Sequence, residues 1–387
     1  MRVAIVHYWL VTMRGGEKVL EALLDLFPQA DIFTHVYVPG AVSPGIRARK
    51  VSTSFIQKLP FAAGGYQKYL PLMPLALEQF DLRGYDLVIS SESGPAKGVL
   101  TGADTLHICY CHTPMRYLWD FYQEYLERSG PLTRLALRLF GHRLRLWDAL
   151  SAQRVDYFAA NSHNVARRIA KHYRRDSTVI HPPVDVSAFA PAGGAYPEPE
   201  DYYLYVGQLT GYKRADLAVQ ACTRANRRLI VVGEGEERQK LARMAGPTVS
   251  FEGRLDGQAL CARLQSCRAL LFPGEEDFGI VPLEALAAGR PVIAYGRGGA
   301  LETVSHGKTG LLFEEQSVPA LCDAMDIFES GQYAFESAAL TREAERFSRQ
   351  RFCREFQDFV DQCLNRPFSE LFTQPGSSGA AGAANGD

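Results

Sequence analysis

Residues 202–235 read YYLYVGQLTGYKRADLAVQACTRANRRLIVVGEG, and this stretch decides the fold. Two short runs of apolar, mostly aromatic or β-branched residues, 202–206 and 229–232, flank a stretch with helical apolar spacing, 213–225. A glycine follows each run directly. Short apolar strands that alternate with helices are typical of βαβ units in a buried parallel sheet.

The alternation of strand and helix extends over both halves of the chain. In the second half, further strands are predicted at 249–251, 270–272 and 291–295. In the first half, the predicted strands are 2–7, 32–37, 87–90, 106–110, 157–160 and 178–180. The pattern predicts an α/β protein with two doubly wound parallel sheets.

One helix start can be predicted in detail. Ser162 follows the strand 157–160, and Val165, Ile169 and Tyr173 recur after it at helical spacing. A serine directly before such a pattern is a good N-cap, because its hydroxyl accepts a backbone N–H of the first turn. We therefore expect a helix that begins directly after Ser162.

Length and composition limit the class of protein. The chain has 387 residues, of which 47% are hydrophobic and 22% charged. The length suggests two or three domains, and the composition excludes extensive disorder as well as collagen-like and coiled-coil proteins. Lysine plus arginine number 42 and aspartate plus glutamate 43. The formal charge of −1 gives no basic field for nucleic acid, so no nucleic-acid partner is expected.

The eight cysteines are too sparse for a disulfide scaffold. Cys109 with Cys111, and Cys261 with Cys267, fit neither a zinc site nor a redox pair. Reduced thiols in a cytoplasmic enzyme are therefore expected. The opening 1–6 lacks the apolar length and cleavage site of a signal peptide, and no apolar stretch is long enough to span a membrane.

The stretch FPGEEDFGIVPLE, 272–284, follows a predicted strand and opens a helix. It therefore lies outside the carboxyl end of the sheet, where open α/β folds bind ligands. The backbone N–H groups of residues 278–280 lie at the helix N-terminus, which favours a phosphate or another anion. Near such a terminus, Glu276 and Glu284 suit the hydroxyls of a sugar or ribose. An acidic turn that only complements the helix dipole is the alternative.

Two adjacent cations, Lys213 and Arg214, follow another strand of the same sheet and can reach the same edge. Such a pair suits a diphosphate, and a solvated basic face is the alternative. Gly15 and Gly16, after the first strand of the other half, place flexible backbone at a strand end. An ordinary tight turn explains these glycines equally well.

Together the motifs resemble those of the family 4 retaining glycosyltransferases. The stretch 272–284 is similar to the Glu-x7-Glu signature of that family. Further stretches match the family in order and spacing: 161–162, 181–185, 206–207, 285–293, 298–302 and 307–312. Within the family, the runs 111–117, 212–214 and 273–280 are similar to those of bacterial mannosyltransferases of O-antigen and exopolysaccharide assembly.

The resemblance covers most of residues 1–350 and implies the GT-B architecture, in which two Rossmann-like doubly wound domains face an interdomain cleft. It implies an acceptor-binding N-terminal domain, 1–190, and a donor-binding C-terminal domain, 191–341. Helices at about 342–368 would cross back and complete the N-terminal domain. The tail 374–387 is rich in Gly, Ser and Ala and has nothing to bury, so disorder is expected there.

The same resemblance implies roles for the donor-binding groups of the C-terminal domain. Glu284 would accept hydrogen bonds from the ribose hydroxyls. Glu276 would hold the transferred sugar and the phosphates, together with the backbone of Phe278, Gly279 and Ile280.

Other implied roles concern the phosphates and the reacting centre. Lys213 would neutralise the departing diphosphate, and Gly15 and Gly16 would let the backbone approach the diphosphate or the acceptor. His112 would line the cleft beside the reacting sugar. It lies in a Cys-His-Thr-Pro run at the carboxyl end of a strand, which favours this role over that of a structural histidine.

One donor-site position departs from the family. Gln208 stands where the family usually carries arginine, and a neutral amide removes one of two diphosphate cations. Arg214, beside Lys213, could supply the missing charge, but the sequence leaves the direction of its side chain open.

The resemblance implies transfer of a hexose with retention of configuration. Mannose from GDP-mannose is expected, moved to a polyprenyl-diphosphate-linked saccharide in bacterial surface polysaccharide assembly. No Asp-x-Asp run lies near a predicted strand end, so no metal or other cofactor is expected, and Lys213 and Arg214 would take the place of the metal. Without a convincing carboxylate nucleophile, front-face attack with the leaving phosphate as base is expected.

Two segments indicate an acceptor at a membrane surface. The stretch 128–154 has one acid, Asp148, and six arginines: Arg128, Arg134, Arg138, Arg143, Arg145 and Arg154. Apolar residues interleave with them, among them Leu132, Leu135, Leu139, Leu146 and Trp147. The stretch 55–80 is apolar and aromatic-rich. A basic amphipathic helix can lie on an anionic bilayer, so a peripheral position on the inner face of the plasma membrane is expected; a solvated helix face is the alternative.

Other functions stay open at this stage. A nucleotide-sugar epimerase is disfavoured by the Glu-x7-Glu stretch and the Tyr-Lys-Arg run, which belong to the transferase resemblance. A pyridoxal-phosphate-dependent phosphorylase is disfavoured because no plausible Schiff-base lysine motif is found. A non-catalytic sugar-nucleotide-binding protein is the third alternative, and Gln208 is its best support.

Overall fold

Both halves of the chain wind into parallel sheets. In the computed structural model, which describes residues 1–365, the first sheet is formed by β1 (Val3–His7), β2 (Asp31–Thr34), β3 (Val51–Thr53), β4 (Leu87–Glu92), β5 (Leu106–Cys111), β6 (Tyr157–Ala160) and β7 (Thr178–Val179). The second sheet is formed by β8 (Tyr203–Val206), β9 (Leu229–Val232), β10 (Val249–Gly253), β11 (Ala269–Phe272), β12 (Val292–Tyr295) and β13 (Gly310–Phe313).

The strand order is that of a doubly wound fold in each sheet. It runs β3-β2-β1-β4-β5-β6-β7 in the first and β10-β9-β8-β11-β12-β13 in the second. All pairs of neighbouring strands are parallel. The prediction of an α/β chain with two doubly wound parallel sheets is therefore confirmed.

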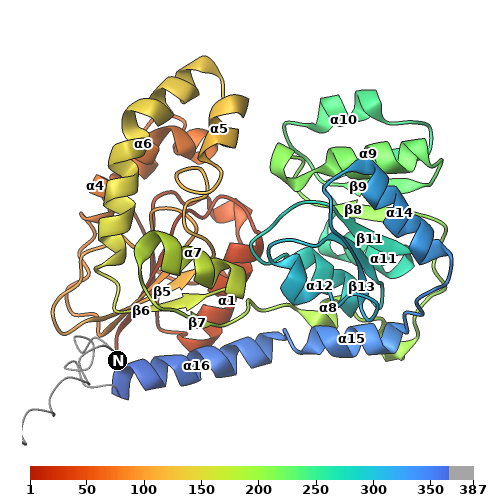
Figure 1. The fold of residues 1–387 in the computed structure, drawn as a ribbon. Helices are drawn as coiled ribbons and strands as arrows, with labels where there is room; N and C mark the ends of the chain where they lie inside the picture. The colour runs from red at the N-terminus through yellow and green to blue at the C-terminus, as the bar shows by residue number, and fades with distance from the viewer. Residues whose placement is uncertain (366–387) are drawn as a thin grey trace, which may run out of the picture.

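Helices cover both faces of the sheets (Figure 1). Those of the first half are α1 (Gly15–Leu26), α2 (Pro44–Arg47), α3 (Ala62–Gly65), α4 (Met73–Leu77), α5 (Tyr122–Arg128), α6 (Pro131–Ala152) and α7 (His163–Tyr173). Those of the second half are α8 (Val186–Phe189), α9 (Ala215–Arg224), α10 (Arg238–Met244), α11 (Gly257–Ser266), α12 (Ile280–Ala287), α13 (Ala300–Thr303), α14 (Val318–Glu329), α15 (Ser337–Glu345) and α16 (Arg349–Asn365). The short 3-10 helices are η1 (Pro39–Ala41), η2 (Phe55–Lys58), η3 (Tyr66–Leu72), η4 (Ala192–Gly194) and η5 (Gly211–Lys213).

Burial on both faces explains why the strands are apolar throughout. In the second sheet, Leu204 and Leu270 pack into one core cluster, whereas their neighbours Tyr205 and Leu271 pack into another. Successive side chains of a strand point to opposite faces, so a strand covered on both sides carries no polar alternation.

The last helix returns to the first sheet. Figure 1 shows α16 running from the C-terminal domain back beneath the N-terminal one. Phe352 and Phe356 of α16 join the core formed by β1 and α1, and the Arg349 guanidinium lies 2.6 Å from the Asp25 carboxylate. The tail 374–387 and the end of the segment 342–368 lie outside the described residues.

Individual elements follow the sequence to different degrees. Ser162 caps α7 as predicted, because its Oγ accepts the Val165 N–H at 3.0 Å. Two strands, β3 and β13, were not predicted. They have only three and four residues, and β3 is a partly exposed edge strand without a long apolar run. Within residues 1–365, no helix combines the length and the apolar character needed to cross a bilayer.

Candidate active site

The candidate site lies where the strand order of each sheet reverses. In the second sheet this point falls between β8 and β11, and in the first between β1 and β4. The loop after β8 carries Lys213, and the loop after β11 carries Glu276. Loops on either side of such a reversal diverge and leave a crevice at the carboxyl ends of the strands, which is where doubly wound sheets bind ligands.

The two loops meet in an ion pair. Lys213 Nζ lies 2.9 Å from Glu276 Oε1, and both side chains are about four-fifths buried. Burial disfavours the charged lysine, but the Glu276 carboxylate outweighs burial and raises the pKa of Lys213. Lys213 is therefore a permanent cation at the edge of the second sheet.

Glycines hold the β11 loop in place. The Gly299 N–H donates to the Glu276 carbonyl oxygen at 2.8 Å, and a Cβ at Gly299 would collide with the backbone of Phe278. On the other side, a Cβ at Gly274 would lie 2.8 Å from the Lys213 carbonyl oxygen. The ion pair between Lys213 and Glu276 thus depends on close backbone contacts that side chains would prevent.

The first turn of α12 has no side-chain cap. Gly279 precedes the helix with a φ of +86°. The N–H groups of that turn point away from the helix, where they favour negative charge. Phe278 is buried and stacks on the ring of His181 at 5.3 Å between centroids, which fixes the turn.

Glu284 lies one turn further along α12 and is buried. Its Oε1 lies 2.8 Å from Nζ of Lys18, a residue of α1 in the other domain. Beside Lys18, a cavity of about 640 Å³ opens between the domains, with Phe189, Gln258 and Arg349 on its wall.

The first sheet contributes His112, at the carboxyl end of β5. Its Nε2 lies 2.9 Å from Ser91 Oγ, which lies 3.0 Å from Nδ1 of His7. The other nitrogen of the His7 ring lies 3.7 Å from the Glu17 carboxylate. Burial, together with nearby His7, lowers the pKa of His112 to about 3, so the ring is neutral at physiological pH.

Gly15 and Gly16 begin α1 at the same edge. A Cβ at Gly15 would lie 2.7 Å from the Ile280 side chain of α12, and a Cβ at Gly16 would collide with the Tyr8 hydroxyl. Backbone of the first domain therefore touches the start of the helix whose N–H groups face the cleft.

Asp277 also joins the two domains. Its carboxylate pairs with Arg168 and lies 2.7 Å from Arg116 Nη2, and its carbonyl oxygen accepts from the Ser162 hydroxyl at 2.7 Å. Sequence reasoning missed Asp277, Arg116 and Arg168. Asp277 and Arg116 lay inside the quoted motifs, but nothing local showed that they would face each other.

The side chain of Arg214 has partners of its own. Its left-handed backbone, with a φ of 53°, turns the side chain toward Asp216 at 3.0 Å and Gln316 at 3.0 Å. That Arg214 supplies the charge missing at Gln208 stays a prediction; in the structure its side chain pairs with Asp216. Gln208 itself is exposed on the loop after β8.

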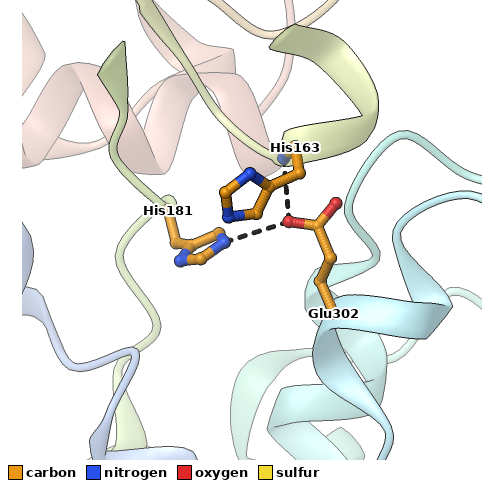
Figure 2. Close-up of side chains that lie close together, drawn as sticks. All are labelled: His163, His181 and Glu302. Atoms are coloured by element: carbon orange, nitrogen blue, oxygen red, sulfur yellow. Dashed lines mark hydrogen bonds and ion pairs between the residues drawn. The ribbon is translucent and has the colours of Figure 1, made fainter. Parts of the chain in front are cut away.

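Within residues 1–365, one group of side chains has the spacing of a metal site. Figure 2 shows His163, His181 and Glu302, whose ligand atoms lie within 4.8 Å of one another. Glu302 accepts the backbone N–H groups of His163 at 2.8 Å and Asn164 at 3.0 Å, and it lies 3.1 Å from His181 Nε2. Its oxygens therefore already cap the start of α7, which is the role that the geometry supports.

Comparison with known proteins now decides the family. The profile described as Glycosyltransferase Family 4 matches residues 13–188, and that described as Glycosyl transferases group 1 matches residues 187–347. A GDP-mannose-dependent alpha-mannosyltransferase of Mycobacterium tuberculosis is 34% identical over 312 residues, which cover 76% of this chain and 78% of that protein. The chain belongs to glycosyltransferase family 4.

Other relatives match over shorter regions. A GDP-mannose-dependent alpha-mannosyltransferase of Mycolicibacterium smegmatis is 34% identical over 139 residues, 34% of this chain and 37% of that protein. The human alpha-1,3/1,6-mannosyltransferase ALG2 is 29% identical over 225 residues, 49% of this chain and 53% of that protein. The chain thus spans about a third to a half of the length of these two relatives.

Solved structures share the fold over nearly the whole chain. A sucrose-phosphate synthase of Thermosynechococcus elongatus has a TM-score of 0.73 and 18% identity, covering 94% of this chain and 99% of that one. Anabaena Alr3699/HepE in complex with UDP has a TM-score of 0.69 and 15% identity, covering 94% and 100%. These neighbours confirm the GT-B architecture.

Proposed function

We propose that the chain is a retaining glycosyltransferase that moves mannose from GDP-mannose to a saccharide acceptor. The observation that carries the proposal is the meeting of Lys213 and Glu276 at the reversal point of the second sheet, beside the uncapped start of α12. Across the cleft, the loop that begins with His112 reaches the same place, because its Arg116 pairs with Asp277.

The chemistry follows from the charges. When the bond to the nucleoside diphosphate breaks, negative charge grows on the phosphate, and the Lys213 ammonium and the N–H groups of α12 would stabilise it. Such fixed donors typically lower a barrier by about 3 kcal/mol. Neutral His112 would donate or accept a hydrogen bond at a sugar hydroxyl, and Glu284 would bind the ribose hydroxyls.

No step of this mechanism uses a metal ion. Glu276 is paired with Lys213 and is proposed to hold the sugar, so it does not serve as a nucleophile. Attack of the acceptor on the face from which the phosphate leaves, with that phosphate taking the proton, would retain the configuration.

The choice of mannose rests on the relatives. Those from M. tuberculosis and M. smegmatis, each 34% identical, are named as GDP-mannose-dependent. Other relatives are a D-inositol 3-phosphate glycosyltransferase of Streptomyces avermitilis and a D-rhamnosyltransferase of Pseudomonas aeruginosa. The sugar is therefore the part of the proposal that the first experiment must test.

We further propose that the acceptor is a polyprenyl-diphosphate-linked saccharide of bacterial surface polysaccharide assembly, reached at the cytoplasmic face of the membrane. One stripe of α6 supports this, because its leucines point outward: Leu132, Leu135, Leu139, Leu146 and Leu150. Leu132 is 85% exposed, and the exposed Arg138 and Arg143 flank the stripe. Phe61, directly before α3, is 89% exposed. Apolar side chains beside cations suit an anionic bilayer.

Three of the six arginines of the stretch 128–154 contact neighbouring elements. Arg134 bonds to the carbonyl oxygens at the end of α5, Arg145 packs on the Tyr122 ring, and Arg154 pairs with Glu78. These three arginines therefore hold α6 to its neighbours. Trp147 is likewise turned inward, against Gly98.

The test is release of nucleoside diphosphate from GDP-mannose, UDP-glucose and UDP-galactose, each with and without a polyprenyl-diphosphate-linked saccharide. We expect GDP release from GDP-mannose that depends on the acceptor. Conversion of the donor sugar without acceptor would indicate an epimerase instead. Binding of the donor without turnover under any condition would indicate a non-catalytic binding protein.

A further inference from the structure

Arg116 belongs to the N-terminal domain but reaches the donor loops of the other domain. Its Nη2 lies 2.7 Å from Asp277 Oδ2, and its guanidinium carbon lies 5.4 Å from the centre of the Tyr212 ring, directly before Lys213. We propose that Arg116 is a second cation for the diphosphate of the donor, supplied across the cleft. This inference rests on the proposed function.

A second cation would balance phosphate charge that Lys213 alone does not neutralise. A nucleoside diphosphate carries more than one negative charge, and the two cations of the loop after β8 each have an acidic partner: Lys213 pairs with Glu276 and Arg214 with Asp216. The distance between Lys213 Nζ and the Glu276 carboxylate is 2.9 Å. A single shared ammonium and the helix N-terminus would leave part of the phosphate charge without a direct partner.

One N–H group of the Arg116 guanidinium lacks a hydrogen-bond partner within residues 1–365. Its Nε is buried and has no hydrogen-bond partner in the part of the chain that the structure describes. A guanidinium offers five N–H donors in a fork that fits phosphate oxygens, and a buried donor without a partner is costly. A phosphate oxygen of the bound donor would satisfy this N–H.

Arg168, the other arginine that pairs with Asp277, makes more polar contacts through its guanidinium. Its Nη1 bonds to Asp277 and to the Thr113 hydroxyl, and its Nε lies 3.5 Å from Asp120. Because Asp277 is shared between two arginines, its carboxylate keeps a partner when either arginine is replaced. Arg168 therefore serves as the structural counterpart against which Arg116 can be judged.

Arg116 is fixed in position before any ligand binds. It packs against the Phe121 ring at 5.1 Å, and its neighbours Met115 and Leu118 are buried. Asp277 outweighs burial and raises its pKa, so the group stays charged. The positive charge of Arg116 opposes the effect of Glu276 on the pKa of Lys213, because the two cations repel each other. An anion bound between them would relieve that repulsion.

Gln208 provides a way to test position and charge separately. It is exposed on the loop after β8, five residues before Lys213, at the same edge of the second sheet. An arginine at this position would return a guanidinium to the site from the C-terminal domain. If Arg116 acts by its charge at the diphosphate, Gln208→Arg should compensate for its loss.

The experiment is calorimetric titration of the full chain with GDP, UDP and the corresponding nucleosides. We expect Arg116→Gln to weaken binding of the nucleoside diphosphate that the wild type prefers by about tenfold to a hundredfold, and to leave nucleoside binding unchanged. Arg116→Lys should recover part of the loss, and Arg116→Gln combined with Gln208→Arg should recover most of it. Arg168→Gln is the matched control and should leave binding of the nucleoside diphosphate close to that of the wild type.

The possible outcomes distinguish failure of the proposed function from failure of the role given to Arg116. If the wild type binds neither GDP nor UDP, the proposed function fails and the inference fails with it. If the wild type binds and Arg116→Gln binds equally well, the inference alone is overturned. If Arg168→Gln weakens binding as much as Arg116→Gln, the effect comes from the shared contact with Asp277, and the direct role of Arg116 is likewise overturned. Thermal melting of every variant shows whether it is folded.

Discussion

The Lys18 ammonium group on α1 lies 2.8 Å from the Glu284 carboxylate on α12. This contact places the buried acid expected to bind ribose against the opposite domain. Glu284 is only 6% exposed at its side chain, whereas Lys18 is 41% exposed and can move aside. A ribose that enters between the domains would therefore exchange one partner of Glu284 for another.

We predict that Glu284→Ala raises the KM for the donor about tenfold and lowers kcat much less. A carboxylate that binds ribose equally in the ground and transition states contributes to binding alone. Steady-state kinetics with varied donor measure both constants. Lys18→Met is the control and should leave the donor KM within about twofold, because Glu284 remains available. Equal donor affinity in Glu284→Ala and wild type would remove the ribose role.

Glu276→Ala should instead lower kcat about a hundredfold at saturating donor, because its expected partner is the reacting sugar. The change also frees Lys213 from its ion pair, so binding of the nucleoside diphosphate alone should persist. Single-turnover measurements separate the chemical step from binding. Near-normal turnover at saturating donor would place Glu276 outside the site.

Much of the architecture could be predicted because periodicity is a local property. Runs such as 229–232 are apolar on both faces, and only a buried parallel strand explains them. The strand ends then located Lys213 and Glu276, since the topology of a doubly wound sheet puts such loops at one edge.

Contacts between the domains could not be predicted in the same way. Arg116 and Asp277 are separated by more than 150 residues, and their pairing depends on how the two sheets face each other. The direction of Arg214 was equally hidden, because it depends on one left-handed residue that no sequence pattern marks. The direction of a side chain depends on backbone geometry, whereas strands and helices can be read from the sequence pattern.

Chelation of metal ions should leave activity unchanged. The diphosphate charge is expected to fall on Lys213, Arg116 and the first turn of α12, so no ion is needed to neutralise it. The rate of donor turnover is measured before and after EDTA treatment, and again after addition of magnesium or manganese. Loss of activity on chelation, restored by either ion, would overturn this prediction.

His35 gives a prediction about stability and pH. Burial lowers its pKa from 6.5 to about 4, so between these values the unfolded chain binds a proton that the folded chain does not. Stability therefore falls as the pH drops from about 6.5 toward 4. Replacing His35 by Gln removes this term, and the gap in unfolding free energy between wild type and variant should narrow by about 2 kcal/mol from pH 7.5 to 5.0.

Urea titrations at the two pH values measure that gap. His142 is exposed on α6, so His142→Gln is the matched control and should show no such narrowing. A difference in unfolding free energy that stays constant with pH would mean that His35 binds its proton equally well in the folded and the unfolded chain.

The last prediction concerns the leucine stripe of α6. Replacing Arg138 and Arg143 together with Gln should weaken binding to anionic liposomes about thirtyfold, because each cation near such a surface contributes about 1 kcal/mol. High salt should weaken wild-type binding similarly, since the attraction is screened over about a Debye length. Arg145 is left unchanged, because it packs on Tyr122.

Leu135→Ser with Leu139→Ser should weaken binding even at low salt, because the apolar contact is lost while the charges remain. The matched control replaces Arg224 and Arg254, two exposed arginines of the other domain, with Gln and should leave liposome binding unchanged. Donor binding, measured on the same variants by nucleotide titration, should be retained, since the donor loops are not altered. If the wild type does not bind liposomes but forms dimers that Leu135→Ser disrupts, the stripe joins two copies of the chain, and a soluble saccharide becomes the better acceptor.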